Sequence, residues 1–154
     1  MGIIKRFERR GAIVPPPPSG SAELPRILSY DSGTWGIQTA EFQAMSHWVS
    51  WVNGQHKTGS IEFGPITLRN RIYLYISGNA TNEMRYDVVV DGDPVITRYG
   101  NQYLQGRFRG SPFPTITDTS AYFGEIGIIR LTDNHAGGDG WMGVNWDSLV
   151  LGDQ

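Results

Sequence analysis

The stretch "LTDNHAGGDGWMGVNWDSLVL", residues 131–151, decides the fold class of this chain. Gly138, Gly140 and Gly143 have the G-x-G-x-x-G spacing of a dinucleotide-binding fingerprint. That fingerprint requires a preceding strand, a long following helix and an acidic residue about 20 positions further on. Here only eleven residues follow Gly143, and "VNWDSLVL" has the pattern of a strand. We therefore interpret the stretch as a glycine-rich connection between two strands.

The composition predicts one β-rich domain. A chain of 154 residues can bury a hydrophobic core, and its 20 glycines (against a usual share of about 7%) with 12% aromatic residues favour short strands joined by tight turns. The absence of cysteine excludes disulfides and Cys-based zinc sites. A net charge of −2 argues against nucleic acid as a partner. No apolar stretch approaches the ~20 residues that span a bilayer, so we expect no membrane insertion.

The first 25 residues differ from the rest. "MGIIKRFERR" has a net charge of +3, and Pro15–Pro18 favour an extended polyproline rod before a flexible Ser/Gly run. We therefore divide the chain into a basic, proline-rich docking arm and linker (1–25) and a folded domain (26–154). The side chains that we expect to dock on a partner are Ile3, Ile4, Arg6, Phe7, Arg9, Arg10, Ile13 and Val14.

The remainder predicts strands. "IEFGPITLRNRIYLYISG" (61–78) predicts a strand pair around Arg69-Asn70, and Asp91-Gly92 between valine-rich runs predicts a hairpin. "GEIGIIRLTD" (124–133) precedes the glycine-rich connection as the penultimate strand. The segment "TAEFQAMSHWVSWVNG" (39–54) fits either a helix or a strand.

Residues of about 56–151 carry a resemblance to a known family, most specifically in "TDTSAYFGEIGIIRLTDNHAGGDGWMGVNWDSLVL" (117–151). This segment resembles the galactose-binding-domain-like jelly rolls, which include carbohydrate-binding modules attached to glycoside hydrolases. The resemblance implies an all-β, jelly-roll β-sandwich. Two positions depart from the family pattern: Gly78-Asn79 replaces a pair of glycines, and Trp146 replaces a small aliphatic residue. The matching positions are Asp118, Ser120, Tyr122, Gly124, Ile128, Leu131, Asp133, Asn134, Gly137, Gly138, Trp141, Asn145, Asp147 and Leu149.

The carboxylates are better explained by structure than by catalysis. Glycoside hydrolysis needs two carboxylates that flank the bond. Asp91 and Asp93 suit a turn, and Asp133 and Asp147 lie at strand ends, where carboxylates commonly accept backbone N–H bonds. We therefore predict that the protein is not an enzyme.

Ligand candidates gather in the glycine-rich connection. Indole faces stack on sugar rings, so Trp141, with Asn134 and Asp139 for the hydroxyls, is the candidate glycan site. The competing expectation, which we favour for each tryptophan, is packing in the core; it covers Trp35, Trp48, Trp51, Trp141 and Trp146. Asp133, Asn134 and Asp139 offer hard oxygen ligands for a structural calcium ion, and the resemblance makes such an ion plausible. We expect no other cofactor.

Two functions remain open. The first is a jelly-roll module held by its arm on other protein subunits of a capsid or tail, a decoration or fibre protein of a bacteriophage virion that also contacts a cell-surface glycan. The alternative is a soluble carbohydrate-binding module. "MGIIKRFERRGAIV" has no uninterrupted apolar segment, so we expect no signal peptide. This favours synthesis in a host cytoplasm and location in a virion.

Overall fold

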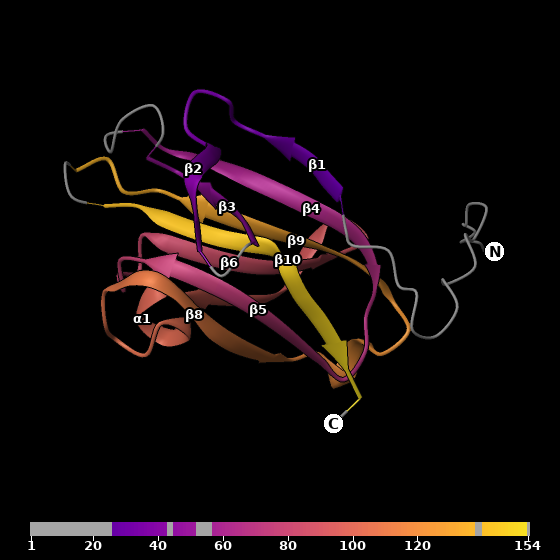
Figure 1. Cartoon of the computed structure of the whole chain (residues 1–154). Helices are drawn as coiled ribbons and strands as arrows, with labels where there is room; N and C mark the ends of the chain where they lie inside the picture. The colour runs from indigo at the N-terminus through magenta and orange to yellow at the C-terminus, as the bar shows by residue number, and fades with distance from the viewer. Residues whose placement is uncertain (1–25, 43–44, 52–56, 138–139, 154) are drawn as a thin grey trace.

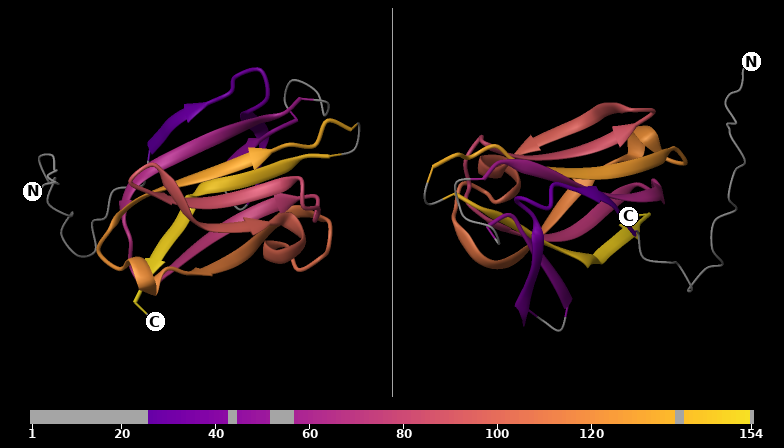
Figure 2. Two further views of the ribbon diagram at one scale, coloured as in Figure 1. Left: turned by 180° about the vertical axis from the view of Figure 1, so that it is seen from behind. Right: turned by 90° about the horizontal axis from the view of Figure 1, so that it is seen from above.

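A computed structural model describes residues 26–42, 45–51, 57–137 and 140–153, which form two stacked antiparallel sheets (Figures 1 and 2). Each sheet has five strands. In the first sheet the order is β1 (Arg26–Tyr30), β4 (Gly59–Thr67), β9 (Ile126–Asp133), β6 (Met84–Val90) and β7 (Asp93–Tyr99). In the second it is β2 (Gly36–Phe42), β3 (Met45–Val49), β10 (Met142–Gly152), β5 (Arg71–Gly78) and β8 (Arg109–Asp118). The short helix α1 (Gly100–Tyr103) and a 3₁₀ turn (Ser120–Tyr122) complete the described elements.

The chain moves repeatedly from one sheet to the other, as in a jelly roll. From β4 to β10 every connection except the β6–β7 hairpin crosses between the sheets. The prediction of an all-β sandwich is therefore confirmed. The chain before Arg26, including every predicted arm residue, lies outside the described residues.

The prediction of a strand pair around Arg69-Asn70 is wrong in one respect. Both strands exist, but β4 and β5 lie in opposite sheets and do not pair with each other. The chain crosses the sandwich at Leu68, whose side chain is fully buried and whose backbone bonds Gly124 and Glu125. Alternation along each strand reports which face is buried, and it does not report the partner strand.

Two other local predictions can now be compared with the structure. Asp91 and Gly92 both have positive φ, 51° and 84°, as a tight primed turn between β6 and β7 requires, so the hairpin is confirmed. The ambiguous segment 39–54 includes the second half of β2 and all of β3. Trp48 of β3 lies in the core with its ring 4.9 Å from that of Tyr30, and this inward packing favours the strand.

The core lies between the sheets and is built by alternation. Ile61 and Phe63 of β4 face Ile72, Leu74 and Ile76 of β5, and all five side chains are completely buried. Burial of a side chain of this size stabilises the fold by about 1.5–3 kcal/mol. The tryptophan prediction holds here too, because Trp35 and Trp48 are core residues.

The two ends of the sandwich differ. At one end, which we call the loop end, lie α1, the connection 79–83 and the described residues of the glycine-rich connection, 134–137 and 140–141 (Figure 1). At the other, the termini end, Arg71 pairs with Gly152, and the described chain enters through Arg26 opposite Gly64. Arg26, the first described residue, therefore lies at the end of the domain opposite the glycine-rich connection.

A candidate ligand-binding site at the loop end

Buried hydrogen bonds fix both ends of the glycine-rich connection. Asp133, the last residue of β9, is 1% exposed, and its carboxylate accepts bonds from the Ser50 hydroxyl (2.5 Å) and the His135 N–H (2.9 Å). The Ser50 oxygen in turn accepts the N–H of Met142, the first residue of β10 (2.9 Å). The expectation that Asp133 accepts backbone N–H bonds at a strand end is confirmed.

The same burial affects the ionisation of Asp133. Desolvation raises the pKa of its carboxyl above the ordinary value of 3.8, and the bonds from Ser50 and His135 only partly oppose that rise. Tyr103 of α1 lies close by, and burial, with a smaller contribution from the charge of Asp133, raises the pKa of its hydroxyl strongly. The base of the loop end is thus a buried polar cluster of Asp133, Ser50 and Tyr103.

The position of the His135 side chain explains why residues 137 and 140 are glycines. A Cβ atom at Gly140 would lie 1.7 Å from Cδ2 of His135, and one at Gly137 would lie 2.7 Å from Nε2. The imidazole Nδ1 pairs with the Glu83 carboxylate. Gly137 and Gly140 therefore lie close against the histidine ring, and glycine is needed at both positions because it leaves the ring room.

The neighbouring connection 79–83 clamps the glycine-rich one at both sides. The Asn79 N–H donates to the Trp141 carbonyl, the Trp141 N–H donates to Asn79 Oδ1 (both 3.0 Å), and the Asn134 N–H donates to the Glu83 carbonyl (2.9 Å). Asn79 thus holds Trp141 through both its backbone N–H and its side-chain oxygen. The sequence analysis missed Ser50, Asn79 and Glu83, because only the fold brings them to residues more than 50 positions away.

Two aromatic rings, those of Trp141 and Phe108, lie next to these hydrogen bonds. The half-buried Trp141 and Phe108 meet edge to face, with ring centroids 6.0 Å apart and planes at 80°. Phe108 is 59% exposed. Exposed aromatic rings beside polar groups are what a sugar ring needs, since its apolar face stacks while its hydroxyls bond. The sequence analysis selected Trp141 and missed Phe108, which lies in an irregular segment.

The other predicted ligands are not gathered at one point. Asn134 is exposed at the loop end, and Asp139 lies outside the described residues. Asp133 is buried and already holds Ser50 and His135, so the calcium set predicted from the sequence has one member engaged elsewhere. Within the described ranges, no group of three or more His, Cys, Asp or Glu side chains is placed to hold a metal ion.

Comparisons with known proteins give a likeness of fold only. No family model and no curated protein matches the chain. Among solved structures, the secreted serine protease VesC from Vibrio cholerae is similar over 78% of this chain, with 8% identity and a TM-score of 0.43; this chain spans about a quarter (24%) of that protein. The Stig cyclase Fisc from Fischerella sp. TAU is similar over 83% of this chain and 88% of its own, with 12% identity and a TM-score of 0.40. An apo cyclase from Fischerella sp. gives 11% identity and 0.40.

These neighbours correct one prediction. The sequence analysis predicted that the chain is not an enzyme, whereas the similar structures come from a protease and from cyclases. We therefore withdraw that prediction. At this identity and these TM-scores the likeness assigns no activity to the chain. Among the described residues, no helix has the length and apolar character needed to cross a membrane.

Proposed function

We propose that this chain is a β-sandwich binding module that is anchored through residues 1–25 and binds a saccharide at its loop end. The observation that carries the proposal is the opposition of the two ends. The described chain enters at Arg26 and leaves at Asp153 on the termini end, whereas Trp141 and Phe108 lie at the loop end. An anchor at one end leaves the aromatic pair free to meet a ligand.

The assembly that we propose is a virion surface, with the chain as a capsid or tail decoration or fibre subunit. The basic, proline-rich composition of residues 1–25 supports this role, because apolar and arginine side chains are common at protein interfaces. The alternative is a soluble carbohydrate-binding module, which would bind the same ligand without subunit partners.

A glycan array with the full chain tests the ligand. We expect binding to saccharides, with loss of most signal in Phe108→Ala. The matched control is Phe123→Ala, which removes a similarly exposed phenylalanine (55%) from the opposite end and should leave binding unchanged. Equal losses in both variants, or no saccharide bound by the wild type, would contradict the proposal.

Limited trypsin digestion tests the anchor. Exposed basic residues near a terminus are preferred cleavage sites. We expect Arg6, Arg9 and Arg10 to be protected in the native assembly and cut within minutes in the isolated protein. Rapid cutting in both preparations would favour the soluble module. Removal of residues 1–20 should leave a folded domain that no longer joins its assembly.

A further inference from the structure

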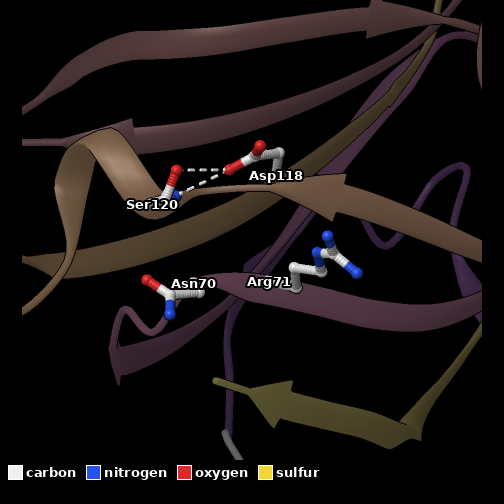
Figure 3. Close-up of a pocket in the computed structure, with 4 residues that line it drawn as sticks. All are labelled: Asn70, Arg71, Asp118 and Ser120. Atoms are coloured by element: carbon white, nitrogen blue, oxygen red, sulfur yellow. Dashed lines mark hydrogen bonds between the residues drawn. The ribbon is translucent and has the colours of Figure 1, made fainter. Parts of the chain in front are cut away.

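A second polar site lies at the termini end, away from the glycine-rich connection. It is a shallow pocket of about 240 Å³ lined by Asn70, Arg71, Asp118 and Ser120 (Figure 3). Strands β5 and β8 build it, and their register places Arg71 directly opposite Asp118. A guanidinium and a carboxylate therefore lie on the two sides of one small opening.

Two acceptor oxygens in the pocket have no partner within the described residues. Oδ1 of Asp118 accepts both the N–H (2.9 Å) and the hydroxyl (2.7 Å) of Ser120, which leaves Oδ2 open. Asn70 donates its amide N–H to the Asp153 carbonyl (2.7 Å), which leaves its Oδ1 open. The bonds from Ser120, and then the charge of Arg71, hold the pKa of Asp118 below its ordinary value, so the carboxylate stays charged and accepts hydrogen bonds.

The pocket also offers a cation that makes no hydrogen bond or ion pair with the described residues. Arg69 is neutralised by Asp153 through two parallel bonds (2.7 and 2.5 Å). Arg71 is exposed and has neither a hydrogen bond nor an ion pair with any residue in the described part of the chain. Its planar fork of donors suits a carboxylate, which it can bind through two parallel hydrogen bonds.

An aromatic ring continues the site along β5. Ile72 and Leu74 face the core, so Arg71 and Tyr73 share the outer face of the sheet. Residues two apart on a strand are about 7 Å apart. This distance lets one six-membered sugar ring contact both side chains.

The surroundings of Tyr73 are apolar. A Cβ atom at Gly152 would lie 2.8 Å from Cε2 of Tyr73, so the ring occupies space that this glycine leaves open. Ile116 of β8 and Val150 of β10 lie opposite Tyr73 on either side, and both are more than half exposed. The outer face thus presents an apolar patch directly beside the polar pocket.

We propose that the Asn70–Arg71–Asp118 pocket and Tyr73 bind an acidic pyranose, a sugar unit that carries a carboxylate. The carboxylate pairs with Arg71, hydroxyls donate to Asp118 Oδ2 and Asn70 Oδ1, and the apolar ring face lies on Tyr73. A simple anion offers no hydroxyls to Asp118 and Asn70 and no ring face to Tyr73, and a neutral sugar offers no carboxylate to Arg71. Only a ligand with both groups satisfies the site. This inference goes beyond the proposed function, because it concerns the opposite end of the sandwich.

The test is an NMR titration of the ¹⁵N-labelled full chain with methyl glucuronide. Methyl glucoside is the matched sugar without the carboxylate, and inorganic phosphate is the anion without the ring. We expect the glucuronide to shift residues around Arg71 and to bind at least about tenfold more tightly than either control. Arg71→Gln should abolish that preference, and Arg69→Gln, the neighbouring arginine outside the pocket lining, should keep it.

Several results would overturn the inference. These are no binding of the glucuronide, equal binding of the glucoside, equal binding of phosphate, or an unchanged preference in Arg71→Gln. Resonances of Trp141 and Phe108 distinguish this site from the loop end. Shifts confined to those two residues would overturn the inference and leave the proposed function standing.

Discussion

Gly140→Ala should destabilise the loop end through a collision with His135. The new methyl group would lie 1.7 Å from Cδ2 and 2.2 Å from Cγ of the imidazole, roughly 2 Å closer than the ~3.5–4 Å of ordinary carbon contacts. The ring has little room to move, because its Nδ1 is paired with Glu83 and Gly137 packs against its Nε2 edge. Such overpacking costs about 1–3 kcal/mol of unfolding free energy, and we expect about 2.

The cause is tested by a double variant. His135→Ala alone should cost about 1 kcal/mol, since it removes the contact with Glu83 and some packing. In Gly140→Ala/His135→Ala the ring is gone, although Cβ of residue 135 still lies 2.7 Å from the new methyl group. The double variant should therefore be more stable than the sum of the two single changes predicts, by about 1 kcal/mol.

The assay is urea unfolding followed by tryptophan fluorescence. Gly33→Ala is the control, because a Cβ atom there has nothing within 4 Å and should change the unfolding free energy by less than about 1 kcal/mol. Strict additivity of the two single changes, or a Gly140→Ala protein as stable as Gly33→Ala, would refute the idea that the glycines exist to accommodate the histidine ring.

Three further predictions concern stability. Gly78 has φ 121°, and a Cβ atom there would lie 2.3 Å from the Trp141 carbonyl oxygen, so Gly78→Ala should lower the unfolding free energy by about 3 kcal/mol or more. The control Gly92→Ala, at φ 84° in open space, should lower it by only about 1 kcal/mol. Equal losses in thermal unfolding would contradict this prediction. Tyr103→Phe should stabilise the fold by about 1 kcal/mol, because the buried hydroxyl has no partner in the described structure; a loss of stability on calorimetry would reveal a bond that the structure lacks. Because the pKa of Asp133 is raised in the folded protein, its protonated carboxyl adds to the free energy of unfolding. This stabilisation is complete below pH 3.8 and is lost as the pH rises through the raised pKa. Asp133→Asn should remove this part of the pH dependence in urea unfolding, and an unchanged slope would contradict the assignment.

Features of the fold that depend only on neighbouring residues in the sequence could be predicted. Asp91-Gly92 can adopt a tight turn with almost any partner strands, so the hairpin is predictable from the dipeptide and its flanking valines. The rejection of the dinucleotide fingerprint held for the same reason, because "VNWDSLVL" continues as part of β10.

Long-range features lay beyond the sequence. Nothing near Leu68 reports that the chain crosses the sandwich there, because alternation is the same for paired and unpaired strands. Gly137 and Gly140 could be recognised as loop residues, but the ring that they accommodate is known only once His135 is placed beside Glu83, 52 positions earlier. The roles proposed for Phe108 and Tyr73 depend on neighbouring residues that are distant in the sequence.

The measurement that tests the central claim most directly is the indole NMR spectrum of the full chain during titration with a saccharide identified on the array. The account predicts that the Trp141 indole resonance shifts in a saturable way while those of the buried Trp35 and Trp48 do not. An unmoved Trp141 resonance at saturating saccharide would contradict a ligand site at the loop end.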